Sequence, residues 1–471
     1  MTEQIIAELE ALRAGDLPTH GGRTLAYVYD SGLAEIDALG IKALTMFSSA
    51  NGLDPTAFPS LLAMEKHLVG FAKPLFHAPE TAVGSVTSGG TESILLAVQS
   101  ARDAHPEIDR PAMILPTTIH AAFHKAAHYF GVERVMVDVD PVSRKASVEA
   151  MAAALDEHRD RVVLMAASAP SYAHGVIDPI HDLAPIAHAH KVRFHVDACI
   201  GGWVLPFTDR VSTPWNFEVE GVTSISADLH KYAYTPKGVS LLLHRTPELR
   251  KPQFFASADW PGYTMLNATT QSTKSGGPLA AAYAVVRRLG VDGYSALTTQ
   301  TLEGVDRLVA GLAPIEHISL ATSPESSLVA LETDDACDVF TISDLMLDRG
   351  WYVQPQMSFG DMAASIHLTV CAATANHIDE FLAAFSDAVA AAVASGPIEI
   401  PADLAAAAQA IDPATLNDEA FDGLLALAGL GGDGGEVSAP DRMAPVNALL
   451  NVAPPALREA LLIAFLDRLS R

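Results

Sequence analysis

The stretch "SISADLHKYAYTPKG" (residues 224–238) joins a short β-like run to a group of reactive side chains. Asp228, His230, Lys231 and Lys237 all follow the run closely. Polar residues at the end of a buried strand are typical of a ligand site, because the carboxyl ends of parallel strands open on one edge of a sheet. Other strands that end at this edge are therefore expected to carry the rest of the site.

Apolar helical runs alternate with short β-rich runs from about residue 66 onward, at spacings that suit βαβ units. The β-rich runs are "PAMILP" (111–116), "ERVMVDV" (133–139), "RVVLMAAS" (161–168), "VRFHVDAC" (192–199), "VTSISA" (222–227) and "VSLLLH" (239–244). This alternation predicts an α/β fold in which helices cover a mainly parallel sheet.

Shifts in composition divide the chain into an N-terminal arm (1–65), a large domain (66–295), a smaller C-terminal α/β domain (296–395) and a helical extension (396–471). The smaller domain is indicated by β-like runs in "SSLVALET" and "SIHLTVCA", which flank a helical pattern. The glycines of "GLGGDGGEVSAPDR" (429–442) match a nucleotide-binding spacing, but no strand precedes them, so a loop is expected.

Bulk composition argues against several classes of partner. The chain has 471 residues and a net charge of −26, so its field as a whole repels nucleic acids and anionic membranes. No stretch reaches about 18 uninterrupted apolar residues, the length that a membrane span requires. Three cysteines, Cys199, Cys337 and Cys371, lie far apart, which favours a reducing cytoplasm over a disulfide framework.

Two further segments place polar groups where a β-like run ends. In "VTSGGTESILLAVQSAR" (86–102), a small-residue turn leads directly into an amphipathic helix, whose free N–H groups and positive end can cradle a phosphate. In "VRFHVDACIGG" (192–202), a buried-strand pattern ends at Asp197, whose carboxylate either caps a local turn or pairs with a cationic ligand. Taken alone, Lys231 is most simply a surface lysine, although a desolvated lysine can form a Schiff base.

Taken together, these groups match the needs of pyridoxal 5'-phosphate (PLP). That cofactor requires a lysine for its aldehyde, an acid that keeps its ring nitrogen protonated, and an anion site for its phosphate. A PLP site on an α/β scaffold is therefore predicted. No metal is expected, because the evenly spaced His120, His124 and His128 have no accompanying cysteine or acidic cluster.

Six segments resemble the sphingosine-1-phosphate lyase family within the fold-type I PLP enzymes, which are related to the group II decarboxylases. They are "VTSGGTESILLA", "IHAAFHKAAHYFG", "SAPSYAHGVIDPI", "HVDACIGGW", "SADLHKYAYTPKG" and "DWPG". The resemblance covers most of residues 20–390. It implies the fold-type I PLP-dependent transferase fold and a homodimer with shared active sites, in which the arm reaches the neighbour's site.

The resemblance also implies roles for individual residues. Lys231 would form the Schiff base, Asp197 would pair with the pyridinium nitrogen, and His120 and Ala198 would lie on the two faces of the ring. The residues that would hold the cofactor phosphate are Gly90, Thr91 and His230. His174 is equally well explained as a buried core histidine. Three candidates for proton transfer stay open: Lys231, Tyr234 and His174.

The expected reaction is cleavage of a Cα–Cβ bond in an amine. Aminotransferases and many decarboxylases of this fold hold the substrate carboxylate with an arginine on a small-domain strand, whereas "SIHLTVCA" offers His367 and no arginine. This absence weighs against transamination and, as the resemblance suggests, favours a retro-aldol lyase acting on an amino alcohol, its phosphate or a related amine. A PLP-dependent amino-acid decarboxylase is the alternative, and a non-catalytic PLP-binding protein comes third.

Substrate recognition departs from the family pattern. Lyases of this family resemble one another in a histidine, a tyrosine and a lysine that grip the substrate phosphate. Tyr29 and Lys237 match the latter two, but Asp54 stands where the histidine is expected. Lys274 replaces a usual arginine, and His124 replaces a usual aspartate. Because an acidic side chain beside a phosphate is repulsive, the chain is predicted to keep the PLP chemistry with an altered substrate.

Overall fold

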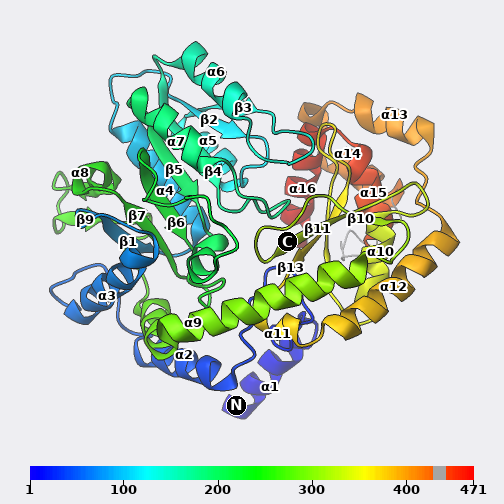
Figure 1. Cartoon of the computed structure of the whole chain (residues 1–471), viewed down its shortest axis with the longest axis horizontal. Helices are drawn as coiled ribbons and strands as arrows, with labels where there is room; N and C mark the ends of the chain where they lie inside the picture. Colours follow the sequence, from blue (N-terminus) through cyan, green and yellow to red (C-terminus); the bar gives the residue numbers. More distant parts are fainter. Residues whose placement is uncertain (428–441, 471) are drawn as a thin grey trace.

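The computed structural model describes residues 1–427 and 442–470 (Figure 1). A large α/β domain and a smaller α/β domain lie along one long helix, α9 (Gly276–Leu312). The backbone of α9 leaves the helical conformation at Gly290, so the helix is kinked there. The boundary predicted at residue 295 thus falls inside an element that both domains share. The loop predicted at 429–442 lies, except for its last residue, outside the described residues.

The large domain is built on a seven-stranded sheet. Its strands in spatial order are β1 (Val83–Thr87), β7 (Ser240–His244), β6 (Val222–Ala227), β5 (Arg193–Asp197), β4 (Val162–Ser168), β2 (Ala112–Pro116) and β3 (Glu133–Val137). Neighbours from β6 to β3 pair in parallel, and β7 runs antiparallel to both of its neighbours. The prediction of a mainly parallel sheet is confirmed, and each β-rich run named above forms one of these strands.

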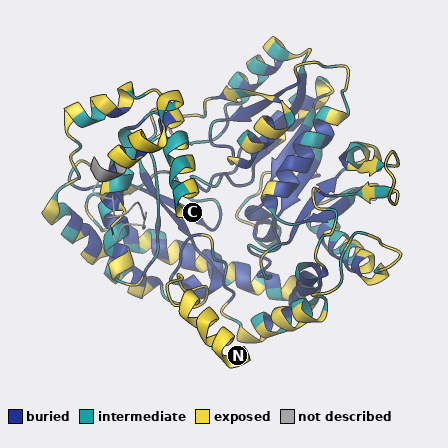
Figure 2. Ribbon diagram, turned by 180° about the vertical axis from the view of Figure 1, so that it is seen from behind, coloured by how far each residue is buried: buried dark blue, intermediate teal, exposed yellow. Residues whose placement is uncertain are grey.

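Helices cover both faces of this sheet, so its strands are largely buried except for the edge strand β3 (Figure 2). Met113 and Leu115 of β2 pack into one apolar core, whereas Ile114 between them packs into another. The helices of the first core are α4 (Gly90–Asp103) and α5 (Ala122–Phe130), and those of the second include α6 (Val148–His158) and α7 (Ile180–Ala189). Burial on both faces is the physical reason why the sequences of β2 and β4 are nearly continuous apolar runs.

The register between β5 and β6 brings four polar side chains onto one face of the sheet. His195 of β5 lies opposite Ser224 of β6, and Asp197 lies opposite Ser226. Side chains two residues apart on a strand point to the same face, so the two pairs are neighbours. Asp197 is thereby placed at the end of β5, beside the turn after β6 that carries Lys231.

The smaller domain is an antiparallel sheet covered by helices. Its strands in spatial order are β10 (Ile318–Leu320), β11 (Leu328–Thr333), β13 (Ser365–Thr369) and β12 (Gln354–Gln356), and its helices are α10 (Val339–Asp348) and α12 (Ile378–Ser395). Leu25 from the N-terminal arm is buried in the core of this domain. The edge strands β10 and β12 were not expected from the sequence, because three residues each are too few to show a pattern.

The terminal segments are helical. The arm predicted at 1–65 contains α1 (Thr2–Arg13), α2 (Ala34–Met46) and the start of α3 (Pro59–Leu75), and α1 buries none of its residues. The remaining elements are α8 (Pro247–Arg250), β8 (Phe255–Ser257), β9 (Met265–Asn267), α11 (Ala372–Ala375), α13 (Ala402–Ala410), α14 (Asp418–Leu427), α15 (Ala444–Val452) and α16 (Pro455–Leu469). Within the described ranges, no helix is both long and apolar enough to cross a membrane.

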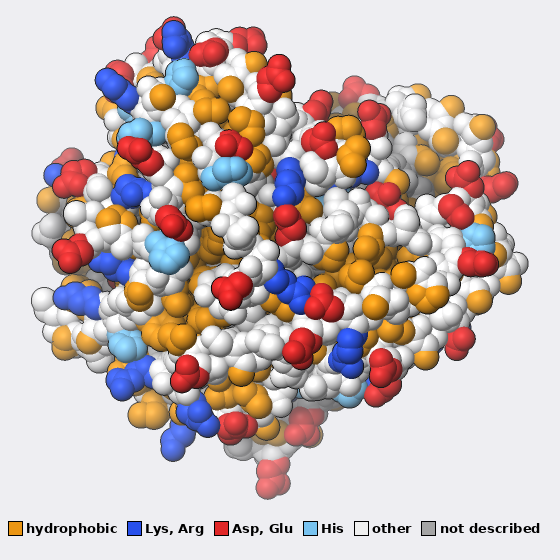
Figure 3. All heavy atoms as spheres, in the orientation of Figure 1, with side chains coloured by type: hydrophobic (Ala, Val, Ile, Leu, Met, Phe, Trp, Pro, Cys, Tyr) orange, Lys and Arg blue, Asp and Glu red, His pale blue; other side chains and the backbone are white. Residues whose placement is uncertain are grey.

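Charged side chains of both signs are mixed on the molecular surface. On the face drawn in Figure 3, lysine and arginine side chains are scattered among aspartate and glutamate and do not gather into one basic patch.

We predict that Gly221→Ala destabilises the large domain much more than Gly131→Ala. Both glycines have a positive φ, +98° at Gly221 and +63° at Gly131, which is unfavourable for alanine. A Cβ at Gly131 would meet open space, but one at Gly221 would lie 2.2 Å from the carbonyl oxygen of Ala184 in α7. Urea unfolding should show a loss of about 1 kcal/mol for Gly131→Ala and of at least about 3 kcal/mol for Gly221→Ala. Equal losses would contradict the packing of α7 against the start of β6.

Candidate active site

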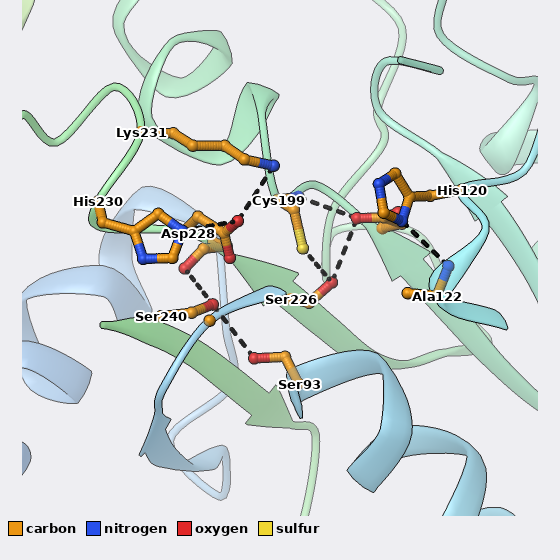
Figure 4. A network of polar contacts seen from close by, with 12 residues as sticks. Ser93, His120, Ala122, Cys199, Ser226, Asp228, His230, Lys231 and Ser240 are labelled. Atoms are coloured by element: carbon orange, nitrogen blue, oxygen red, sulfur yellow. Dashed lines mark hydrogen bonds and ion pairs between the residues drawn. The ribbon is translucent and has the colours of Figure 1, made fainter. Parts of the chain in front are cut away.

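A cavity of about 380 Å³ lies at the carboxyl edge of the large sheet. It is lined by residues that follow β1, β2, β4, β5 and β6, which is where a parallel sheet places its ligands. Figure 4 shows the cluster of polar side chains around it. Six of the predicted site residues line this cavity: Lys231, Asp197, His120, Gly90, Thr91 and His230.

The N-terminus of α4 forms an anion cradle at one end of the cavity. No side chain caps this helix, so its first N–H groups are left for a ligand. Glycines leave the necessary space, because a Cβ at Gly90 would lie 2.7 Å from Asp228 Oδ2 and one at Gly89 would lie 3.2 Å from the ring of His230. The cradle predicted from the sequence is therefore open toward the cavity.

Two acidic side chains tie the cradle to the segment that follows β9. Glu92 accepts the N–H of Ser88 at 2.6 Å and the N–H of Thr270 at 2.9 Å. Lys274 binds Glu65 at 3.2 Å and a main-chain carbonyl of β1 at 2.6 Å. Glu92 also lines the cavity, but hydrogen bonds to Ser88 and Thr270 already engage its carboxylate, and the positive charge of Lys274 is already paired.

Lys231 is held at the floor of the cavity by an ion pair. Its Nζ lies 3.0 Å from Oδ2 of Asp228, whose side chain is 2% exposed. Burial disfavours the charged lysine, but the carboxylate outweighs this effect and raises the pKa of Lys231. Against the same opposing effect of burial, Lys231 lowers the pKa of Asp228. Both groups are therefore charged at neutral pH, and Asp228 Oδ1 is buried without a hydrogen-bond partner.

His230 places its Nε2–H group, a hydrogen-bond donor, at the same floor of the cavity. Its Nδ1 accepts the N–H groups of Gly238 at 3.3 Å and Val239 at 3.2 Å. A ring nitrogen that accepts carries no proton, so the proton of the neutral ring is on Nε2, which lies 3.6 Å from Asp228 Oδ2. His230 thus adds a side-chain donor beside the main-chain donors of the cradle.

Asp197 and His120 form the opposite side of the cavity. Oδ1 of Asp197 accepts the N–H of Cys199 at 3.1 Å and the hydroxyl of Ser226 at 3.4 Å. No hydrogen bond among the described residues involves Oδ2, which leaves that oxygen for a ligand. His120 accepts the N–H of Ala122 at 3.1 Å, and desolvation at the cavity wall lowers its pKa, so its ring is neutral. A neutral ring beside a carboxylate suits a flat, cationic ligand.

Lys237 and Tyr29 lie together close to Lys231. Nζ of Lys237 lies 4.8 Å from the centre of the Tyr29 ring and donates to the carbonyl of Tyr27 at 2.8 Å. None of the ion pairs formed by the described residues includes Lys237. Burial, assisted by the positive charge of Lys231, lowers the pKa of Lys237 to about 8. Burial raises the pKa of Tyr29 to about 12, so its hydroxyl stays protonated.

Besides Lys237 and Tyr29, four more predicted site residues do not line this cavity. Ala198 is fully buried behind Asp197, and His174 is a buried residue whose pKa burial lowers to about 4. The hydroxyl of Tyr234 faces α9, 3.4 Å from Thr301. Asp54 accepts hydrogen bonds within its own exposed turn on the arm. The roles of these four residues therefore rest on the resemblance alone.

Among the lining residues to which the sequence assigned no role, three have polar or ionisable side chains: Asp228, Cys199 and Tyr172. The sequence could have indicated Asp228, because an acidic residue at a buried strand end requires a cationic partner and Lys231 follows three positions later. Cys199 and Tyr172 had no such signal, because a small buried thiol and a loop tyrosine are common without function. His124, which departs from the family pattern, lies 2.6 Å from Arg134, outside the cavity.

Comparison with known proteins identifies the class to which this fold and site belong. The family model described as "Pyridoxal-dependent decarboxylase conserved domain" matches residues 19–333. A second model, "Pyridoxal-dependent enzyme, C-terminal putative HTH domain", matches residues 402–468. The chain therefore belongs to the family of the pyridoxal-dependent decarboxylase conserved domain, and its cofactor is PLP.

The relatives narrow this assignment. The chain is 35% identical to sphingosine-1-phosphate lyase of Dictyostelium discoideum, over 74% of this chain and 66% of that protein. It is 36% identical to sphingosine-1-phosphate lyase 1 of Rattus norvegicus, over 78% and 64%. The solved sphingosine-1-phosphate lyase of Burkholderia pseudomallei is 31% identical, with a TM-score of 0.76 over 84% of this chain and 92% of that one. The chain belongs to the sphingosine-1-phosphate lyase family, and it spans slightly less than two thirds of the length of the first two relatives.

The residues around the cavity fit PLP. The buried, unpartnered Asp228 Oδ1 and the cradle that a Cβ would fill both indicate that a ligand completes the site. The cradle and His230 would hold the phosphate, Lys231 would carry the aldehyde carbon, and Oδ2 of Asp197 would face the ring nitrogen. One anion site, one amine and one carboxylate are thus present in the order that the cofactor requires.

We predict that Asp228→Asn makes the attachment of PLP to Lys231 faster at about pH 7 and less dependent on pH. Only the neutral amine attacks an aldehyde, and Asp228 keeps Lys231 protonated. The wild-type rate should therefore rise about tenfold per pH unit below the pKa of Lys231. Without the carboxylate, burial dominates and lowers that pKa, so the rate at neutral pH increases.

Stopped-flow absorbance after mixing the cofactor-free chain with PLP measures this rate. Lys231→Ala is the control, because it has no amine at this position and should develop no absorbance from attached cofactor. A wild-type rate that does not change with pH would show that Asp228 does not hold Lys231 in its charged form.

Proposed function

We propose that the chain is a PLP-dependent carbon–carbon lyase that cleaves the Cα–Cβ bond of an amino alcohol and releases an aldehyde and an amine. The names of its relatives support this proposal. One observation carries it further: among the residues that the structure describes, the small-domain side of the site presents no unpaired cation for an α-carboxylate. Substrates of aminotransferases and decarboxylases carry that carboxylate, whereas amino alcohols do not.

His367 stands where other enzymes of this fold use a carboxylate-binding arginine. It is fully buried, stacks on the ring of Tyr172 at 4.1 Å and lies 2.9 Å from the hydroxyl of Thr369. Burial lowers the pKa of His367 to about 3, so its ring is uncharged at neutral pH. A neutral ring cannot replace the bidentate ion pair that an arginine makes with a carboxylate.

The basic side chains that reach toward the small domain from the loop before α6 are also occupied. Arg144 pairs with Glu332 of β11 at 3.4 Å, and Lys145 pairs with Glu325 at 2.7 Å. Using either cation for a substrate would leave a partly buried glutamate unpaired, which is unfavourable. The small-domain side of the site therefore favours a substrate without an α-carboxylate.

The proposed chemistry divides the work between cofactor and chain. Bound PLP supplies the electron sink for the charge left at Cα. Of the three proton-transfer candidates, Lys231 is the one that lines the cavity. In its uncharged form, its Nζ is proposed to accept the proton of the substrate hydroxyl and then to donate it to Cα. Asp228 faces this Nζ and keeps it in place while it gains or loses the proton.

Lys237 is the proposed contact for an anionic group of the substrate. It has no acidic partner among the described ion pairs, whereas Lys274 is already bound to Glu65. Asp54, if the arm approaches the site, would repel a phosphate. We therefore propose an amino alcohol substrate whose phosphate, where one is present, is held mainly by one lysine, so that unphosphorylated amines are also accepted.

We predict that Lys237→Met lowers kcat/KM about tenfold for a phosphorylated amino alcohol and less than about twofold for its unphosphorylated counterpart. Because the pKa of Lys237 is about 8, the difference between the two substrates should shrink in the wild-type chain as pH rises past that value. Mass spectrometry of the aldehyde and amine products, over a panel that also contains amino acids, measures both effects.

Lys125→Met, at an exposed position of α5, is the matched control and should leave both substrates unaffected. Release of CO₂ from an amino acid without formation of an aldehyde would identify a decarboxylase instead. A chain that binds PLP but converts no amine would support the third possibility, a binding protein.

We also propose that the chain forms a homodimer through the arm and the β8–β9 hairpin. Large apolar side chains of this hairpin are 44–62% exposed: Phe255, Trp260, Tyr263 and Leu266. Beside them lies a cavity of about 300 Å³, where Arg250 Nε and Asn267 Oδ1 are buried without a partner. Exposed apolar area next to unpaired polar atoms is typical of a surface that a protein partner covers.

Combining Trp260→Asp with Leu266→Asp is predicted to convert the dimer to monomers, because two charges would be buried in an apolar contact. Val142→Asp, at a residue that is 82% exposed and distant in sequence, should not change the assembly. Sedimentation velocity measures the molecular mass of each variant, and a wild-type chain that sediments as a monomer would refute the interface.

A reducing compartment, the cytoplasm, is proposed as the site of action. The three cysteines are buried and unpaired, which supports this proposal. A disulfide bond found by mass spectrometry in protein taken directly from cells would contradict it.

A further inference from the structure

Behind Asp197 lies a row of buried polar side chains that the proposed reaction does not use. His195 and Ser226 are 0% exposed and Ser224 is 4% exposed. His195 Nδ1 lies 2.8 Å from Ser224 Oγ, and its Nε2 lies 3.1 Å from Ser226 Oγ. Ser226 Oγ lies 3.4 Å from Asp197 Oδ1. These side chains form a continuous chain of hydrogen bonds that ends on the carboxylate (Figure 4 shows Ser226 beside the cavity).

The direction of these hydrogen bonds follows from counting protons. A charged carboxylate can only accept hydrogen bonds, so the hydroxyl of Ser226 must donate its one proton to Asp197. His195 Nε2 must then donate to Ser226, as must the thiol of Cys199, which lies 3.2 Å away. Burial raises the pKa of Cys199, so the thiol keeps its proton. With Nε2 protonated, His195 Nδ1 accepts from Ser224, and every donor in the chain points toward Asp197.

The neutral ring that this arrangement requires agrees with the surroundings of His195. Burial lowers its pKa to about 4, and the opposing effect of Asp197 is smaller. The ring therefore carries one proton at neutral pH and can relay one hydrogen bond, accepting on one side and donating on the other. Hydrogen bonds linked in this way strengthen one another in a medium of low dielectric constant.

A buried histidine that is satisfied by its neighbours needs no function, and His244 of β7 is such a residue. It is 1% exposed, and its Nε2 lies 3.1 Å from Gln253 Oε1. None of its hydrogen bonds leads to the cavity. His195 differs because its hydrogen bonds end on a carboxylate whose other oxygen is left for the ligand.

We propose that His195 and Ser226 are positioning residues that hold Asp197 charged and oriented, with Oδ2 directed at the ring nitrogen of PLP. The inference rests on the placement of the cofactor proposed above. Hydrogen bonds donated to a carboxylate favour its charged form, and two donors on Oδ1 limit its rotation. A charged, fixed carboxylate in turn keeps the ring nitrogen protonated, which the electron sink requires.

The test compares Ser226→Ala, His195→Asn and the double variant with His244→Asn, each as the full chain loaded with PLP. ¹⁵N NMR of PLP labelled at the ring nitrogen reports the protonation of that nitrogen without turnover, and equilibrium titration gives the Kd of PLP. Ser226→Ala removes a single oxygen atom, so it keeps the test available if His195→Asn does not fold.

Ser226→Ala and His195→Asn are each expected to move the ¹⁵N signal toward that of unprotonated pyridine and to raise the Kd of PLP about tenfold, the loss typical of one hydrogen bond to a charged group. Because both act through one chain, the double variant should be no worse than Ser226→Ala alone. His244→Asn should leave both readouts unchanged even where it lowers Tm.

The proposal is overturned if neither variant moves the signal, if their effects add, or if His244→Asn moves it equally. Asp197→Asn separates this failure from a failure of the proposed site. If Asp197→Asn also leaves the signal unchanged, the ring nitrogen does not face this residue and the placement of the cofactor is wrong. If Asp197→Asn alone moves it, the placement holds and the positioning chain is wrong.

Discussion

The ion pair between Lys231 and Asp228 sets the conditions for the rest of the site. The two charges lie 3.0 Å apart at the carboxyl edge of the sheet, and either one alone would be strongly unfavourable there. The same carboxylate lies so close to the start of α4 that a Cβ at Gly90 would approach within 2.7 Å of it. The glycine that opens the anion cradle is therefore also what allows the helix, the aspartate and the lysine to meet in one small volume.

Few charged side chains line this cavity: Lys231 and Asp228 lie on its floor, Asp197 on the opposite side and Glu92 at the start of α4. Burial keeps His120, His195 and His367 neutral by lowering the pKa of each. In a poorly solvated site a fixed charge acts strongly on a ligand, so the positions of the few charged groups decide what can bind. Lys231, Asp197 and the helix end suit a phosphorylated, cationic ring, while toward the small domain the cations Arg144 and Lys145 are already paired with glutamates.

Departures from the family pattern have different physical meanings. Lys274 stands in place of an arginine, but Glu65 and a main-chain carbonyl already satisfy its charge, so it helps to hold the segment after β9 against β1. Asp54 instead remains on the surface of the arm, where its carboxylate binds only its own turn. The change at Lys274 thus acts on the structure, whereas Asp54 alters the charge on the surface of the arm.

The sequence by itself determined most strands of the large sheet, the mainly parallel character of that sheet, and the edge at which Lys231, Asp197 and the α4 cradle meet. These follow from local apolar patterns and from the rule that parallel strands end on one side, so they need no knowledge of distant contacts. The tertiary structure alone decided which partners these groups have. Lys274 pairs with Glu65 across 209 positions, and Asp197 gains Ser226 and His195 through the register of β5 and β6. In the tertiary structure, Tyr234 faces α9 and His174 is buried in the core. No local sequence pattern predicts this, because the packing of the two domains fixes where a loop side chain points.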